Sequence, residues 1–339
     1  MTQLALVGFA EPWYVQIIKS VVLFAVAVQL VPMVLLAERK LLGRFQHRYG
    51  PNRVGPMGMA QPLADIIKLA TKENFQPSTA VGFLYTAAPI VSLLTALAAF
   101  AIIPFGDVVN IFGQDVGLYG LDVGIGILYV FAFGSIAFYG LMLGGWASGS
   151  KYSFLGAMRA AAQLISYEIA MGLSLVGVIM MAGTLSLPSI VEAQSGLWYA
   201  VPQFVGFVIF VIAGFAETNR APFDLPEADA ELVAGYNTEY GGSKFASYFF
   251  AEYVNILVVS GIAVTMFLGG WQLPFVDPPS WVDPFVVLAK IFAFVFLFVW
   301  IRATLPRLRY DQLMSFGWKI LLPLATVNAL VTAIVVVAV

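Results

Sequence analysis

Long apolar runs alternate with shorter polar connections along the whole chain. A helix needs about 20 predominantly apolar residues to cross the hydrocarbon core of a bilayer. Eight runs approach that length, at residues 13–37, 80–103, 122–146, 157–183, 199–217, 244–268, 285–302 and 316–338. The pattern predicts an all-α integral membrane protein, with eight transmembrane helices in a single membrane domain over residues 1–339.

Basic residues are distributed unevenly between the connections. The connections 38–79, 147–159, 217–244 and 302–319 contain nearly all of the 17 Lys and Arg residues. Basic connections stay on the cytoplasmic side of a membrane. We therefore expect these four inside and both termini outside, in the periplasm. The remaining bases, Lys19 and Lys290, fall near the outer ends of their helices, where long basic side chains can extend to the interface.

Composition agrees with a membrane protein and limits its chemistry. The chain is 60% hydrophobic and 11% charged, against about 45–50% and about 25% in soluble domains. It has no cysteine, which excludes disulfides and thiolate-held iron–sulfur or zinc sites on this chain. The single histidine, His47, argues against a haem or His-rich metal site and is expected at the surface. We expect the chain to bind no metal or cofactor of its own.

The first inner connection, 38–79, contains a short amphipathic pattern. Within residues 60–73, Leu63, Ile66 and Ile67 lie on one face of a helix. A helix of this length is too short to span the membrane, so we expect it to lie in the inner interface.

Basic residues precede this helix, among them Arg39, Arg48 and Arg53. One interpretation is that they anchor the chain to anionic lipids. The other is that they border an opening, walled by the interfacial helix, through which an amphipathic lipid-like substrate enters.

The third inner connection, 217–244, is strongly acidic. The stretch ETNRAPFDLPEADAELVAGYNTEY contains one base, Arg220, and the carboxylates Glu217, Asp224, Glu227, Asp229, Glu231 and Glu239. Its prolines favour a short helix that begins at Asp224, with Glu227 completing a capping box. That interpretation accounts for two of the acids.

Glu231 needs a different explanation. If the helix continues, Asp224, Glu227 and Glu231 share one stripe, where like charges repel. Such a group titrates as a coupled set in which at least one pKa is raised. The acidic loop is therefore a candidate for taking up and releasing protons near neutral pH.

Two further acids lie inside predicted spans. Glu168 and Glu252 fall about 15 Å and about 12 Å from the inner ends of their helices. Ionised acids at such depth are costly, so they usually face a polar path or a partner. A buried pair, for example Glu168 with Arg159, is one alternative. The other is a proton path, in which Glu217 joins the acidic loop to the two interior acids.

Several segments resemble one known family. They are AERKLLGRFQHRYGPNRVGP, GGWASGSKYSFLGAMRAAAQLISYE, NRAPFDLPEADAELVAGYNTEY and RATLPRLRYDQLMSFGWK. In this order they are similar to the H subunits of bacterial respiratory complex I, the proton-pumping NADH:quinone oxidoreductase. The resemblance runs from about Ala37 to Lys319, nearly the whole chain.

The resemblance implies a subunit of the bacterial inner membrane that is not catalytic alone. It implies soluble partner subunits that carry flavin and the terminal iron–sulfur cluster, other membrane subunits, quinone as substrate, and lipids, but no nucleic acid. By motif, it places eight residues around the quinone-access chamber: Arg39, Arg48, Arg53, Asp65, Asp224, Glu227, Asp229 and Glu231. It assigns Glu168, Glu217, Glu231 and Glu252 to a proton path.

One position departs from the family pattern. Some members have a glutamate in the third span where this chain has Ala137. A proton path through this subunit must therefore pass Ala137 by way of water or another side chain.

Two other functions are compatible with the residues. The chain could anchor a related energy-converting hydrogenase or another dehydrogenase, or it could be a stand-alone proton-coupled transporter. The absence of an evident internal repeat disfavours a transporter. On the complex I interpretation, Glu231→Gln should leave the complex assembled but strongly lower quinone reduction, whereas Asp224→Asn should act mainly through helix capping.

Overall fold

Helices make up most of the computed structural model, which describes residues 12–111, 114–120, 122–226, 229–274 and 279–338. Within these described ranges, seven helical segments are long and apolar enough to cross a membrane. They are α2 (Trp13–Phe45), α4 (Gly82–Phe100), α5 (Gly126–Ala147), α6 (Lys151–Ala182), α10 (Gly242–Phe267), α11 (Asp283–Thr304) and the run Tyr310–Ala338. The prediction of a helical integral membrane protein is confirmed at this level.

The predicted span at 199–217 is a shorter helix. It corresponds to α8 (Phe204–Glu217), which at 1.5 Å per residue is about 21 Å long. The last segment is divided into α12 (Tyr310–Phe316), a π-helical turn (Gly317–Leu321) and α13 (Leu322–Ala338).

Helices extend past the apolar runs at the inner ends. The first apolar run ends at residue 37, but α2 continues to Phe45, and α6 begins at Lys151 instead of residue 157. Residues 38–45, ERKLLGRF, are mostly good helix formers, so the helix continues after the apolar pattern stops. Apolar length alone therefore misses the polar helical turns that carry charged groups.

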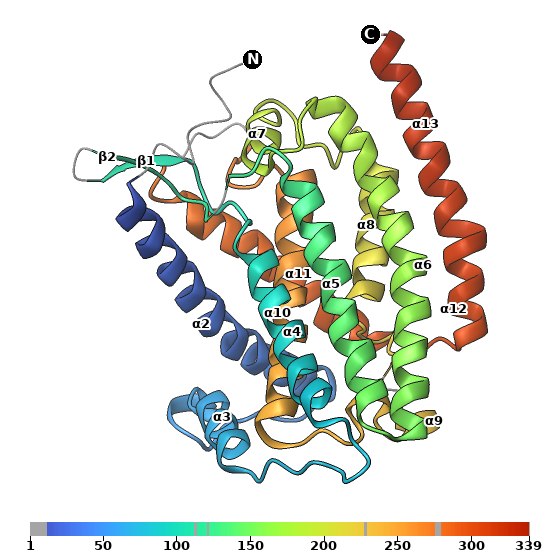
Figure 1. Ribbon diagram of the computed structural model, residues 1–339. Coiled ribbons are helices and arrows are strands. Elements are labelled where there is room, and N and C mark those ends of the chain that lie inside the picture. Colours follow the sequence, from blue (N-terminus) through green and yellow to red (C-terminus); the bar gives the residue numbers. More distant parts are fainter. Residues whose placement is uncertain (1–11, 112–113, 121, 227–228, 275–278, 339) are drawn as a thin grey trace.

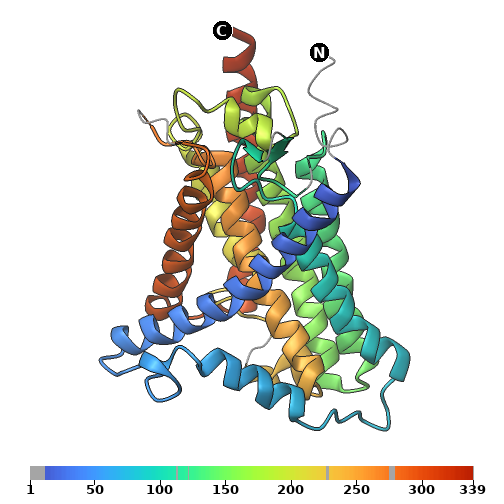
Figure 2. The same ribbon diagram turned by 90° about the vertical axis from the view of Figure 1, so that its left-hand side faces the viewer.

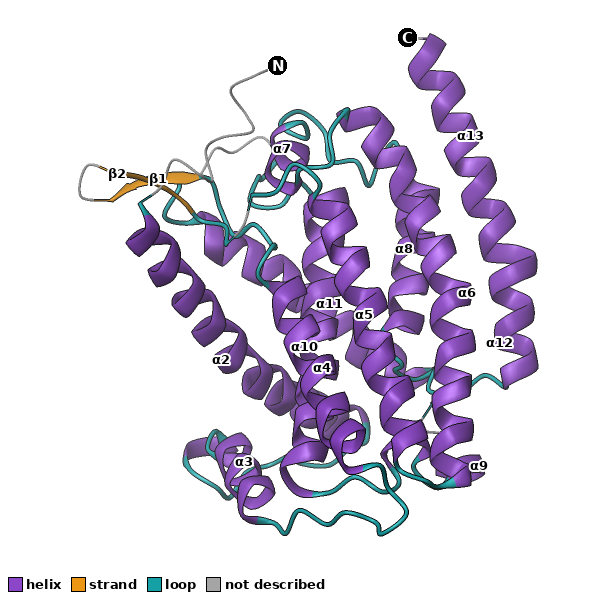
Figure 3. Ribbon diagram, in the orientation of Figure 1, coloured by secondary structure: helices purple, strands orange, loops and turns teal. Residues whose placement is uncertain are grey.

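Both ends of the described chain lie at the same end of the bundle (Figure 1). We call this the outer end. It also carries α7 (Leu187–Glu192) and a hairpin of β1 (Val108–Ile111) and β2 (Gln114–Gly117), in which Val108 lies opposite Gly117. The opposite, inner end carries α3 (Gln61–Thr71) and the short α9 (Asp229–Leu232) (Figure 3).

The central helix is α10, which packs against α2, α4, α8 and α11. In its most apolar 18-residue window 78% of the residues are buried, against 17% for the C-terminal segment that contains α13. Figure 2 shows that α2 instead slants across one side of the bundle. A charged side chain on α10 is consequently enclosed by protein rather than by lipid.

Lys290 of α11 binds backbone carbonyls near the outer end of α10. Its Nζ donates hydrogen bonds of 2.7 Å to the backbone carbonyls of Leu268, Gly270 and Gln272. These carbonyls lie at and beyond the C-terminus of α10, where backbone oxygens lack partners within the helix. Lys290 therefore caps α10 and joins it to α11.

Candidate functional site

The start of the loop between α8 and α10 is fixed to α6 by one buried amide. Gln163 Nε2 donates to the backbone carbonyls of Ala216 and Phe223, at 2.7 Å and 2.8 Å. Because these two carbonyls lie on either side of the turn that contains Arg220, the amide holds that turn against the bundle.

Tyrosines fix the end of the same loop. The rings of Tyr85 and Tyr240 stack with centroids 4.3 Å apart. Tyr85 Oη donates to the carbonyl of Glu239 at 2.5 Å, and Tyr240 Oη donates to the carbonyl of Gly144 at 3.2 Å. The loop is thus attached to α4 and α5, although its sequence is strongly polar.

A buried ion network lies where this loop meets α2 and α11. Glu38, 5% exposed, forms an ion pair with Arg302 and accepts a hydrogen bond of 2.6 Å from Tyr253 Oη. Arg220 Nη1 lies 3.9 Å from Oε1 of the same carboxylate. The Glu38 charge is therefore offset by two bases from different parts of the chain.

Arg220 also pairs with a second carboxylate. Its Nε lies 2.6 Å from Oε1 of Glu252, and its guanidinium lies 4.6 Å from the centre of the Tyr253 ring. Buried charges are tolerated when they are paired in this way, and removing one partner is strongly destabilising. Arg220 thus links α2 to the central helix.

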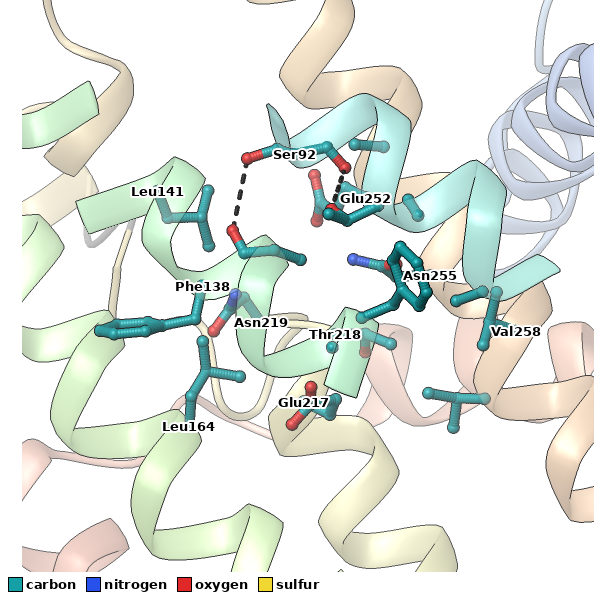
Figure 4. Close-up of a pocket in the computed structure, with 18 of the residues that line it drawn as sticks. Ser92, Phe138, Leu141, Leu164, Glu217, Thr218, Asn219, Glu252, Asn255 and Val258 are labelled. Atoms are coloured by element: carbon teal, nitrogen blue, oxygen red, sulfur yellow. Dashed lines mark hydrogen bonds between the residues drawn. The ribbon is translucent and has the colours of Figure 1, made fainter. Parts of the chain in front are cut away.

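Glu252 also faces an interior cavity of about 80 Å³. Glu168 of α6 and Glu217 at the end of α8 line the same cavity. Figure 4 shows Glu252 and Asn255 on one side of the cavity and Glu217 on the other. At about 30 Å³ per water molecule the cavity has room for a few waters. The structure thus brings together the two acids predicted inside spans, Glu168 and Glu252, and Glu217, which was predicted to join them to the acidic loop.

The cavity differs from the ion network because its described lining contains no Lys, Arg or His. Glu168 Oε1 accepts a hydrogen bond of 2.7 Å from Ser135 Oγ. Glu217 Oε2 is buried and has no hydrogen-bond partner among the described residues. A cavity of this size and polarity is suited to water, which can hydrogen-bond such a group.

Ala137 forms part of the cavity wall. Its backbone carbonyl lies 3.5 Å from Ser92 Oγ on the neighbouring α4. A glutamate here would extend several atoms further than the methyl group, so the alanine leaves open space beside the three acids.

The prediction of a helix that begins at Asp224 is wrong. Asp224 lies in irregular structure, residues 225–226 form a turn, and helix α9 begins at Asp229. Leu225 precedes Pro226, and the residue before a proline disfavours the α conformation. Asp224 therefore does not cap a helix, and Glu227, its expected partner, lies outside the described residues.

Glu231 lies away from the cavity lining and is exposed. It forms an ion pair with Arg159, and the hydrogen bond from this guanidinium lowers the pKa of Glu231. The pairing of Arg159 with Glu168, one of the two alternatives from the sequence, is not observed, because Arg159 pairs with Glu231. Glu231 is therefore not the member of the acidic set whose pKa is raised.

The first inner connection is held by another ion pair. Arg39 Nη1 lies 2.5 Å from Asp65 Oδ2, which joins α2 to α3. Burial alone would raise the pKa of Asp65, but the hydrogen bond and charge of Arg39 outweigh it and lower the pKa. Arg48 and Arg53 are exposed, and so is His47, in agreement with its predicted surface position.

Three residues of the ion network were missed by the sequence analysis: Glu38, Arg302 and Tyr253. Glu38 could have been found, because it continues the buried stripe of Ala27, Val31 and Val34 at helical spacing. Nothing local in the sequence indicates that Arg302 contacts it.

The matched family model covers most of the chain. It is described as NADH dehydrogenase and matches residues 18–333. The chain belongs to this family. It is 51% identical over 318 residues to the NADH-quinone oxidoreductase H subunit 1 of Geobacter metallireducens, covering 94% of this chain and 95% of the relative. It is 53% identical over 296 residues to the NADH-quinone oxidoreductase H subunit of Protochlamydia amoebophila, covering 87% of this chain and 90% of that relative.

The range matched to the NADH dehydrogenase family contains the whole ion network and the cavity, from Glu38 to Arg302. Seven long apolar helices in a member of this family make the chain a multi-pass protein of the bacterial inner membrane.

Proposed function

We propose that this chain is the membrane subunit of a proton-translocating NADH:quinone oxidoreductase that forms the quinone-access chamber with a soluble iron–sulfur arm. It couples quinone reduction to proton movement and catalyses no reaction alone. Flavin and iron–sulfur clusters belong to partner subunits in this proposal, because this chain has no cysteine. The observation that carries the proposal is Glu252, which pairs with Arg220 on one side and lines the acidic cavity on the other.

The membrane topology is part of the proposal. We infer eight spans, with α8 as the short fifth span and the outer end of the bundle in the periplasm. Two features support this: both described chain ends lie at the outer end, and most bases are in the connections at the inner end. On α3, Leu63, Ile66 and Ile67 are exposed, as expected of a helix whose apolar face rests in the inner interface.

The inner end provides the chamber. Arg39 and Asp65 hold α3 against the polar end of α2, and with exposed Arg48 and Arg53 they border the proposed opening. The acidic loop, with Asp224, Glu227, Asp229 and Glu231, forms the surface toward the soluble arm in this proposal. Since quinone is amphipathic, an apolar helix beside charged groups suits both its tail and its head.

The coupling step depends on Arg220. Its guanidinium lies between two carboxylates, close to Glu252 and further from Glu38. Quinone reduction consumes two protons or leaves negative charge at the inner end. Either event changes the field at the network and favours a shift of Arg220 toward Glu38. Glu252 then loses its counter-charge and takes up a proton from the cavity.

Water completes the path in this proposal. Water molecules in the cavity would connect Glu252 with Glu217 and Glu168, passing the position where Ala137 has no carboxylate. Since Glu217 Oε2 lacks a hydrogen-bond partner among the described residues, water is the group available to exchange a proton with it. Proton movement toward the other membrane subunits would continue from Glu168.

Affinity purification tests the proposed function. The tagged chain is isolated in mild detergent and assayed for NADH-driven reduction of a short-chain quinone and for hydrogen evolution. We expect quinone reduction with co-purifying flavin and iron–sulfur proteins. Hydrogen evolution would instead indicate a hydrogenase anchor, and an intact lone chain with neither activity would indicate a transporter.

A further inference from the structure

An apolar groove of about 760 Å³ lies beside the outer half of α2. It is separate from the acidic cavity, and no residue lines both. One wall is α2 from Tyr14 to Val26, and the others come from the hairpin region, residues 116–119, and from Pro284 and Leu288 of α11. Its volume falls within the range of about 300–1,000 Å³ that is typical of small-molecule sites.

The groove has the length of one membrane leaflet. From Tyr14 to Val26 the helix rises about 18 Å. Half of a hydrocarbon core of about 30 Å is about 15 Å. An extended acyl chain of a single leaflet therefore matches the groove from the interface to the middle of the membrane.

The outer half of α2 packs less closely against the protein than the inner half does. Its buried residues begin only at Ala27, and a second hollow of about 140 Å³ lies along Ser20, Leu23 and Phe24. Figure 2 shows the cause, because α2 slants relative to the bundle. In a membrane, hydrocarbon is the material available to fill an apolar groove of this kind.

One charged residue indicates which kind of lipid the groove would bind. Lys19 is the only charged side chain among the described residues that line the groove. Its Nζ lies 5.0 Å from the centre of the Tyr119 ring, and Tyr14 lines the same groove. An ammonium group beside aromatic rings near the outer end of a membrane helix is suited to the phosphate of an anionic lipid.

We propose that this groove holds an acyl chain of one anionic phospholipid from the outer leaflet, with its phosphate at Lys19. The lipid fills the space under the outer half of α2 and stabilises the tilt of the helix whose inner half carries Glu38. The leaflet assignment rests on the proposed topology. The binding itself does not depend on quinone reduction, so its test measures lipid rather than turnover.

Photo-crosslinking in the assembled complex tests the proposal. A photoreactive amino acid replaces Val22, which lines the groove, or Val28, which is 39% exposed on the same helix but does not line the groove. The complex is placed in nanodiscs that contain radiolabelled phosphatidylglycerol or phosphatidylcholine. We expect strong labelling by phosphatidylglycerol at position 22, with weak labelling at position 28.

Lys19→Gln should lower labelling by phosphatidylglycerol about fivefold, the effect of one basic residue at a membrane surface, and leave labelling by phosphatidylcholine unchanged. The control Lys72→Gln removes an exposed base at the inner end and should change neither. Crosslinking of position 22 to a protein segment would overturn the proposal, because protein would then fill the groove. Equal labelling by both lipids, or at both positions, would also overturn it.

Discussion

Four interior carboxylates of this chain fall into two groups with different surroundings. Glu38 and Glu252 are paired with Arg302 and Arg220 in a compact ion network. Glu168 and Glu217 line a cavity whose described walls carry no base, and one oxygen of Glu217 has no partner among the described residues. While its ion pairs are formed, the first group is stabilised in the ionised form and holds helices together, whereas the second has no cation to offset the cost of ionisation.

The difference shows how one subunit can combine stability with charge transfer. A fully paired network resists change, and a cavity of unpaired acids alone would have no link to the inner end. Glu252 belongs to both groups, so a change in its pairing alters the charge beside the cavity. We therefore regard Glu252 as the connection between quinone chemistry and proton movement.

The largest expected effect comes from removing the shared base. Arg220→Met leaves Glu252 without its closest counter-charge and weakens the pairing of Glu38. Loss of one partner from a buried ion pair costs about 3–5 kcal/mol. We expect a clear fall in the thermal stability of the purified complex, measured by scanning calorimetry.

The matched control for Arg220→Met is Arg309→Met. Arg309 forms an exposed pair with Asp311, and exposed pairs contribute little. Equal stability of the two variants would show that the Arg220 network is not structural.

Glu217→Gln tests the second group, the acids that line the cavity without a neighbouring base. Glutamine keeps the shape and burial of the side chain but cannot release a proton. We expect an assembled complex of normal stability whose quinone-linked proton pumping falls at least about tenfold, or about 1.4 kcal/mol. Pumping is measured with a pH-sensitive dye in proteoliposomes. Glu192→Gln, at the exposed end of α7, is the control and should pump normally. Normal pumping by Glu217→Gln would remove this acid from the path.

Ala137→Leu tests the water in the cavity. The larger side chain would occupy the space beside the acids without changing any charge. We expect proton pumping to fall several-fold, with an overpacking cost of about 1–3 kcal/mol. Ala147→Leu is the control, because Ala147 lies in the same helix, α5, and is buried but does not line the cavity. If both variants lose stability equally and neither loses pumping, the cavity has no role in proton movement.

The smallest effect is expected for Glu231→Gln. Because Glu231 is exposed and Arg159 lowers its pKa, this acid stays ionised as pH falls from 8 to 6. An exposed ion pair contributes about 0–1 kcal/mol to the stability of the fold. A folded-state pKa below its unfolded value gives stability that is present at neutral pH and lost only in acid. We expect quinone reduction within about twofold of wild type, measured across that pH range. A strong loss would support the role that the acidic-loop pattern alone predicted.

The sequence predicted the membrane class, most spans and the three interior acids, because apolar length and the cost of buried charge are local signals. It did not predict the ion network, since Glu38 and Arg302 are 264 positions apart and meet only through helix packing. The helix expected at Asp224 failed because the restriction before Pro226 outweighed the capping pattern. Short elements such as the β1–β2 hairpin also escaped prediction, because they lie in connections without a strong periodic pattern.

The central claim is that Glu217 exchanges a proton when quinone is reduced. Infrared difference spectroscopy of the assembled complex, between its oxidised and quinol-reduced states, measures this directly through the carbonyl stretch of protonated carboxyl groups. We predict a carboxyl band that changes on reduction, is absent in Glu217→Gln and is retained in Glu192→Gln. The same band with unchanged amplitude in Glu217→Gln would contradict the account.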